Sequence, residues 1–596
     1  MSEHCARSIC PYDQLMPLIL NPCKPFKWPV FGFILLLFLL TGCATQTQQV
    51  KMNEGKEQFK TGNLQNSVAT IQDAFKTKNT LYYLEMGQVQ RLLGPSQITN
   101  STNSLRIADA QVERWEIETN ERLKRSFSDV SSYLLSEGLS SEYDPKLYEI
   151  SFLSQTLALN HLSQGRWNDA MVEAKKMAQR EKVIEELVQR KTAALSQVEQ
   201  NQQNNPTTRG ATSQIQEING YPVNLLDDEE TRSLKNTYQN PSAYYLSAFI
   251  YESQGETSLA APGYRLSLEL QPSVSFFKSS LANLDANIKN RNIRKSADTL
   301  VIIDTGYMPK ITPYKLNQTF TIGNGPKLVT LTFPVIEKST ERFAPYSIEL
   351  GGVSVKPELV TNLDTMARRN LKDDMPAYVL RASSRALVSL AAQYAADRAV
   401  QQSSNRNNQN NNNAAIAGAI AGLLTGLAMQ SVNVTDVRHW STLPAQTYMA
   451  RLNLPIGSNL LKYVTPSGLT LSQTVNLVGG YNVIYIRMFR DRATVLTSND
   501  PKATQQPIQF LVSKESGELN AKEMTNSVTI PPQELAPSEA RSSFFDGLKG
   551  LVGIYPETKP ALAMETPTPT PSASPSSVNM GDESPTLLNR FQQLFK

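Results

Sequence analysis

The residue types most often used in catalysis and metal binding are few in this chain. Its four cysteines are Cys5, Cys10, Cys23 and Cys43, so neither a disulfide framework nor a cysteine-ligated metal can lie in the main body. Its three histidines are His4, His161 and His439, which nearly excludes a zinc site built from His and Cys. The chain also lacks a Gly-x-Ser-x-Gly elbow, a phosphate-binding loop and an HExxH helix. We therefore expect no catalytic residues, no metal and no cofactor.

The two later histidines stand in settings that favour structural roles. His161 falls within an apolar helical pattern, where a buried histidine with its hydrogen bonds satisfied is the usual arrangement. His439 belongs to the segment Asp436–Pro444, for which we expect a folded corner with Trp440 in the core and Asp436 or Arg438 tying down the turn. A catalytic pair of His439 with an aspartate is the alternative, but no nucleophile stands in a recognisable setting.

Cys43 is the one residue with a strong chemical signal. Lys24 and Lys27 precede an uncharged apolar run, Val30–Leu40, which ends in Leu40-Thr41-Gly42-Cys43. A short basic region, an apolar run and small residues before a cleavage point are typical of a secretory signal, and the run is shorter than the ~20 residues that span a bilayer. We expect a signal peptide over residues 1–42, starting at Met1 or Met16. The segment Leu40-Thr41-Gly42-Cys43 resembles the lipobox of bacterial lipoproteins, and this resemblance implies lipidation of Cys43. The alternative is an apolar anchor with an incidental cysteine.

The composition is that of a folded protein with no preference for nucleic acid. The chain has 596 residues, of which 40% are hydrophobic and 19% charged, with a formal net charge of +4. This composition excludes a wholly disordered chain. The near-balanced charge provides no global basic field for nucleic acid.

Residues 43–297 are predicted to form pairs of helices. Helical patterns end at glycines near Gly62, Gly94, Gly165 and Gly255, and in each case a second helical pattern follows. In the clearest pair, Tyr244–Pro272, a turn glycine, a small residue, an aromatic residue and a proline occur at spacings that resemble a tetratricopeptide repeat. The sequence therefore favours a TPR-like helical solenoid, and an irregular helical bundle is the alternative. The charged stretch Met171–Val198 is predicted to be a helix with a solvated face, followed by a loop over Gln200–Gly210.

Residues 298–515 are predicted to form a strand-rich α+β domain with a helical insert at 373–430. The run Leu300–Ile303 indicates a buried strand, and alternating segments indicate further strands. These segments are Leu328–Ile336, Tyr346–Val355, Tyr448–Leu454, Thr474–Val478 and Tyr481–Met488. Within the insert, an amphipathic helix is predicted for Asp373–Val400.

The Ala/Gly-rich run Ala414–Met429 carries no charge, and Gly418, Gly422 and Gly426 recur on one face of a predicted helix. Small residues at this spacing let another helix approach closely. We expect a buried partner for the preceding helix; self-association between copies and insertion into the membrane are the alternatives.

The C-terminal part changes composition twice. After a mixed extension at 516–558, residues 559–585 are rich in proline, serine and threonine, which predicts an extended linker. In the last segment, 586–596, Leu587, Leu588, Phe591 and Leu594 share one face of a short amphipathic helix. Because so short a helix is marginal alone in water, we expect it to dock on a partner or on a groove of this chain. Membrane-surface contact and a frayed end are the alternatives.

The segment Asp-x-Arg-x-Trp-x-x-Leu-Pro at 436–444, with the helical pairs and the Cys43 motif, resembles a family of uncharacterised Gram-negative lipoproteins with TPR-like N-terminal helices. The resemblance implies an envelope location, on the periplasmic side of the outer membrane because Ala44 follows Cys43, and no enzymatic role.

We therefore expect a lipid-anchored scaffold or adaptor that binds other envelope proteins. It could be an accessory subunit of an envelope assembly or secretion system. A membrane-inserting oligomer that uses Ala414–Met429 is the second hypothesis, and a periplasmic hydrolase that depends on His439 is the third.

Overall fold

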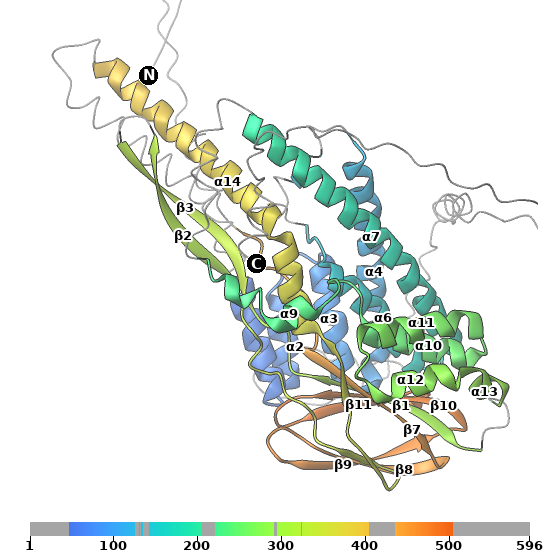
Figure 1. Cartoon of the computed structure of the whole chain (residues 1–596). Helices are drawn as coiled ribbons and strands as arrows, with labels where there is room; N and C mark the ends of the chain where they lie inside the picture. Colours follow the sequence, from blue (N-terminus) through green and yellow to red (C-terminus); the bar gives the residue numbers. More distant parts are fainter. Residues whose placement is uncertain are drawn as a thin grey trace, which may run out of the picture. The chain divides into compact units, whose positions relative to one another are not determined.

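The computed structural model describes residues 47–125, 130, 133–134, 142–204, 221–290, 295–322, 325–404 and 435–504. A helical region comes first and a strand-rich region follows it (Figure 1). This order confirms the coarse architecture expected from the sequence.

The helical region begins with a helix over residues 47–60, which we call the first helix. The longer helices that follow are α2 (Leu64–Asp73), α3 (Thr80–Leu92), α4 (Ile98–Leu123), α6 (Leu147–Ser163), α7 (Trp167–Asn204), α10 (Pro241–Gln254) and α11 (Thr257–Leu270). Shorter helices are α9 (Glu229–Ser233), α12 (Ser275–Ala282) and α13 (Leu284–Lys289). The predicted breaks at Gly62, Gly94, Gly165 and Gly255 are all confirmed as left-handed or otherwise positive-φ positions. The predicted loop from Gln200 is wrong at its start, because α7 continues to Asn204.

The pair α10–α11 shows how the local sequence builds these helices. The side chain of Asn240 caps α10 by accepting hydrogen bonds from the N–H groups of Ser242 and Ala243. The helix ends at Gly255, whose φ of 84° suits glycine. On α11, a Cβ atom at Gly263 would lie 2.9 Å from the carbonyl oxygen of Tyr244. The small residue therefore sets how closely the two helices pack.

The strand-rich region contains three sheets. A five-stranded sheet has the order β11-β10-β1-β7-β6, a four-stranded sheet has the order β5-β4-β8-β9, and β2 and β3 form a hairpin. The strands are β1 (Ala297–Thr305), β2 (Ile311–Ile322), β3 (Gly325–Ile336), β4 (Ile348–Leu350), β5 (Val353–Val355), β6 (Glu358–Asn362), β7 (Gln446–Leu454), β8 (Gly457–Val464), β9 (Thr470–Leu477), β10 (Gly480–Met488) and β11 (Ala493–Thr497). The central strand β1 pairs parallel with β10 and antiparallel with β7.

The five-stranded sheet is covered on both faces. One face, with Leu300 and Ile302 of β1, packs in a hydrophobic cluster with side chains from α6, α7, α10 and α11. The other face, with Val301 and Ile303, packs against residues of the four-stranded sheet such as Leu461. Burial on both faces explains why the centre of β1, Leu300–Ile303, is a continuous apolar run and not an alternating one. Helices from before residue 298 and strands from after it thus share one hydrophobic core.

The long helix α14 (Leu363–Ser404) follows β6 directly. The sequence predicted a helix from Asp373, so the helix begins ten residues earlier than expected. Asn362 accounts for the earlier start, because its side chain accepts a hydrogen bond from the N–H of Thr365. Ion pairs also stabilise the start of α14. Arg368 is fully buried and contacts Asp228, just before α9, at 2.6 Å and Glu230, on α9, at 2.9 Å.

Candidate functional site

The segment 436–444 is held by two buried carboxylates that come from the helical region. Glu149 of α6 accepts a hydrogen bond of 2.7 Å from the backbone N–H of Trp440. Glu85 of α3 accepts from the N–H of Ser441 at 2.7 Å and from the N–H and hydroxyl of Thr442 at 3.1 and 2.5 Å. Both glutamates are 1% exposed, and the side chain of Trp440 is fully buried. The expected corner with Trp440 in the core is therefore confirmed.

Asp436 and Arg438 close the turn at the start of this segment. The carboxylate of Asp436 accepts from the backbone N–H of Arg438 and from Nε and Nη2 of its guanidinium, each at 2.9 Å. Burial opposes ionisation of Asp436, but the hydrogen bonds from Arg438 lower its pKa. Because this carboxylate is committed to Arg438, it does not orient His439 as a catalytic partner would.

The two histidines in the described part of the chain are buried and held in the neutral form. Burial lowers the pKa of His439 to about 4, with the positive charge of Lys56 acting in the same direction. Its Nδ1 lies 3.2 Å from the carbonyl of Val437. Burial likewise lowers the pKa of His161 to about 4, helped by the neighbouring Arg166. Both side chains lie in the protein interior, and Nε2 of His439 has no hydrogen-bond partner among the described residues.

The pKa values of the buried glutamates are raised, whereas those of the histidines are lowered. Burial raises the pKa of Glu149 to about 7, although the N–H groups of Trp440 and Lys146 and the hydroxyl of Tyr143 favour its ionised form. Burial also raises the pKa of Glu85, against the hydrogen bonds from Thr442 and Ser441 and the charge of Lys56. Both carboxylates are tolerated in the interior because they accept hydrogen bonds: Glu85 from Ser441 and Thr442, and Glu149 from Trp440, Tyr143 and Lys146.

A pocket of about 100 Å³ opens beside this segment. It is lined by the first helix, by Phe75, by Leu81 and Glu85 of α3, by Lys310 and Thr312, and by residues of the 436–441 stretch that include His439. Gln49 of the first helix connects this helix to two other segments beside the pocket. Its side-chain amide donates hydrogen bonds to the carbonyls of Ile311 and Val437. Lys56 also lines the pocket and is only 5% exposed.

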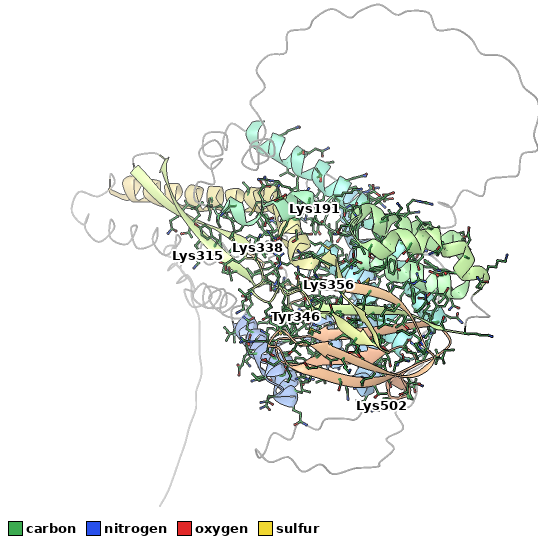
Figure 2. The ribbon with its side chains drawn as sticks, turned by 60° about the horizontal axis from the view of Figure 1, so that its bottom comes forward. Lys191, Lys315, Lys338, Tyr346, Lys356 and Lys502 are labelled. Atoms are coloured by element: carbon green, nitrogen blue, oxygen red, sulfur yellow. The ribbon has the colours of Figure 1, made fainter. Side chains whose placement is uncertain are left out.

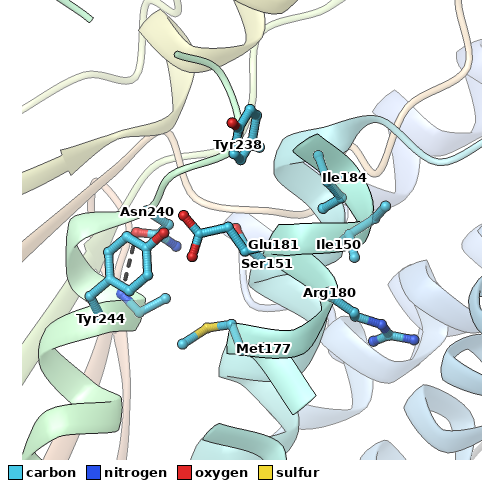
Figure 3. Close-up of a pocket in the computed structure, with 10 residues that line it drawn as sticks. Ile150, Ser151, Met177, Arg180, Glu181, Ile184, Tyr238, Asn240 and Tyr244 are labelled. Carbon is cyan, nitrogen blue, oxygen red and sulfur yellow. Dashed lines mark hydrogen bonds between the residues drawn. The ribbon is translucent and has the colours of Figure 1, made fainter. Parts of the chain in front are cut away.

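A second pocket lies between α6, α7 and α10 (Figure 3). Its lining includes Met177, Glu181 and Tyr244, and its volume is about 20 Å³. This is space for roughly one water molecule, so the pocket beside 436–441 is the larger candidate for a ligand.

The charged residues of α7 bear out one prediction with an exception. A solvated face was expected, and Lys182, Glu185 and Glu186 are exposed. Arg180 is the exception, because its side chain is buried and pairs with Asp109 at 2.6 Å and Glu116 at 3.2 Å on α4. Further along α7, Lys191 forms an ion pair with Asp374 of α14 at 3.4 Å. Lys191 is labelled in Figure 2. The charges of this helix therefore join it to neighbouring helices as well as facing solvent.

The predicted site residues themselves lie outside the described part of the chain. This holds for the lipidation residue Cys43, for the packing glycines Gly418, Gly422 and Gly426, and for Leu587, Leu588, Phe591 and Leu594 in the last segment. In the described ranges, no cluster of three or more His, Cys, Asp or Glu residues could hold a metal. Within those same ranges, no helix combines the length and apolarity needed to cross a bilayer.

Among the residues of this region, Arg438 and His439 were singled out from the sequence, whereas Lys56, Glu85 and Glu149 were not. Glu85 and Glu149 are each a single carboxylate inside an apolar helical stretch. A charged residue among apolar ones is the sequence feature that could have indicated them. Lys56 carries no such signal, because its burial depends on segments more than 250 residues away. In comparisons with protein-family models, with curated proteins and with solved structures, no match to this chain was found.

Proposed function

We propose that this chain is a non-catalytic, lipid-anchored scaffold or adaptor of the Gram-negative envelope, attached through Cys43 to the periplasmic side of the outer membrane. The observation that carries the proposal is the short distance between the anchor motif and the folded body. The first helix begins at residue 47, and its Met52 and Phe59 are already 6% and 1% exposed. A chain acylated at Cys43 would therefore hold its folded body at the membrane surface, with no long tether.

The helical pairs support a role in binding other proteins. The pairs α6–α7 and α10–α11 each turn at a glycine with positive φ. Ala260 and Tyr264 of α11, two positions of the TPR-like pattern, are fully buried against α10. Helical repeats of this kind usually present a surface for peptides or partner helices. We infer that the partners are other envelope proteins.

Replacing Cys43 tests the anchor. In Gram-negative cells, the wild-type chain should incorporate labelled palmitate and fractionate with the outer membrane. The Cys43→Ala variant should lose the label and leave the outer-membrane fraction, while Cys23→Ala, the control, should retain both properties. Label in the Cys43→Ala variant, or an unlabelled wild-type chain, would contradict the proposal.

Cross-linking in intact cells tests the adaptor role. A photo-reactive residue at the exposed Val172 of α7 or Ile107 of α4 should capture a stoichiometric envelope protein. Recovery of only self-cross-linked species would contradict the adaptor proposal and favour the alternative of an oligomer.

A further inference from the structure

Lys56 is a buried cation without a partner in the described part of the chain. Its side chain is 5% exposed, and its ammonium forms no hydrogen bond or ion pair with any of the described residues. The ring of Tyr307 lies near it, with its centre 5.7 Å from the ammonium nitrogen. A buried ammonium is costly unless it is paired, so this pocket provides a charge that a ligand can neutralise.

The nearby carboxylates are already occupied by other donors. Glu85 accepts three hydrogen bonds from Ser441 and Thr442. Glu341 pairs with Lys60 and accepts from the N–H of Tyr307. Burial lowers the pKa of Lys56 to about 8, and these two carboxylates only partly oppose that effect. At neutral pH the side chain is therefore still charged, and Lys310 adds a second cation to the pocket lining.

The pocket also has apolar walls. Met52, Phe75, Leu81 and Val437 line it together with Lys56. At about 100 Å³, it is smaller than a cavity of about 150 Å³ that holds benzene, so it suits a carboxylate with a short aliphatic group. Glu85 in the lining disfavours a dianionic phosphate more strongly than a monoanionic carboxylate, because like charges repel at short range.

We propose that this pocket binds the C-terminal carboxylate of a peptide whose last residue is small and aliphatic, with Lys56 as the cation. A terminal residue presents its carboxylate and its side chain from the same Cα atom, which matches a cation beside an apolar wall. Gln48, Asn53 and Thr312 add amide and hydroxyl groups to the lining that can pair with the peptide backbone. The inference rests on the proposed scaffold role, since it names the chemistry of a partner.

The test uses the mature chain in detergent and isothermal titration calorimetry. The probe is acetyl-Gly-Gly-Val with a free carboxylate, and its C-terminal amide is the matched ligand. We expect the free acid to bind and the amide to bind at least tenfold more weakly, since hydrogen bonds to charged groups are commonly worth about that factor. Equal binding of acid and amide, or no binding of the acid, would overturn the proposal without any variant being needed.

Two lysine variants locate the site. Lys56→Met should reduce affinity for the free acid at least tenfold and retain the fold, because it replaces an unpaired buried cation by an apolar side chain of similar length. Lys51→Met, on the exposed side of the same helix and outside the pocket lining, should bind as the wild type does. Unchanged affinity in Lys56→Met would remove the pocket from consideration.

Competing ligands show whether the pocket prefers a peptide carboxylate, a free small carboxylate or phosphate. Isobutyrate binding as tightly as the peptide would overturn the peptide assignment in favour of a free small carboxylate. Displacement of the peptide by inorganic phosphate at lower concentration than by acetate would overturn the choice of carboxylate. If the protein binds the peptide but captures no other protein in cells, the scaffold role is contradicted and the pocket assignment is not. If it captures a protein in cells but does not bind the peptide, the pocket assignment is contradicted and the scaffold role is not.

Discussion

Glu149 shows how one buried residue gives the protein a pH-dependent stability. Its pKa is raised from 4.5 to about 7, chiefly by burial, so the folded state holds this proton more tightly than the unfolded state does. The stability that Glu149 contributes is therefore present at low pH and is lost as the pH rises from about 4.5 to about 7. His161 and His439, lowered from 6.5 to about 4, act in the opposite direction over a similar range. Because these pKa shifts oppose each other, the stability of the wild type should change less with pH than the shift of any one group implies.

Glu149→Gln isolates the carboxylate contribution. In this variant the free energy of unfolding should increase between pH 4.5 and 7 relative to the wild type, by on the order of 3 kcal/mol over the range. Urea denaturation at several pH values measures this difference. Glu54→Gln, at an exposed position of the first helix, serves as the control and should follow the wild-type profile. If the free energy of unfolding changed with pH in the same way in Glu149→Gln and in the wild type, Glu149 would not contribute to the pH dependence of stability.

At the scale of elements, close helix approach depends on small residues that the sequence makes visible. Gly255 at the turn and Ala260 and Tyr264 on α11 were predicted from their spacing, and the structure buries the latter two completely. Strand β2 was not predicted, and its Pro313 is a residue that disfavours the interior of a sheet. The hairpin β2–β3 has only two strands, so a proline is tolerated there.

Gly263→Ala tests the α10–α11 contact. The added Cβ atom would lie 2.9 Å from the carbonyl oxygen of Tyr244 and 3.0 Å from the Cβ atom of Ala248, so the helices must move apart. We expect a destabilisation of about 1–3 kcal/mol, typical of overpacking, measured by chemical denaturation. Ser258→Ala, exposed on the same helix, is the control and should stay within about 0.5 kcal/mol of the wild type. Wild-type stability in Gly263→Ala would mean that the two helices pack less closely than the structure shows.

At the scale of the whole molecule, the helical and strand-rich regions depend on each other. Side chains of α10 and α11 share a hydrophobic cluster with Leu300, Val483 and Tyr485 of the five-stranded sheet. An ion-paired network crosses the same boundary, since Arg451 of β7 contacts Glu252 of α10 at 2.8 Å and Asp298 of β1 at 2.7 Å. Removing either region would expose both the apolar cluster and these charges.

A fragment that ends at residue 290 should therefore fail to fold on its own. Without the sheet, the inner faces of α10 and α11 lose their apolar partners, and Glu252 loses Arg451. We expect a broad, non-cooperative thermal transition by circular dichroism, whereas residues 47–504 together should show one cooperative transition. A sharp transition for the shorter fragment would contradict this mutual dependence.

The sequence alone determined the local features: the helix-ending glycines, the buried strand at Leu300–Ile303, the order of helices before strands, and the motif at Cys43 that underlies the proposed anchor. These follow from backbone preferences and from short-range patterns of apolar residues, which need no knowledge of distant contacts. Only the tertiary structure decided that Arg180 is buried beside Asp109 and that Glu85 and Glu149 hold the 436–444 segment. It also decided that Lys56, which has no partner among the described residues, faces a pocket. Each of these depends on groups far apart in the chain, and burial acts on a charge only after the fold has brought those groups together.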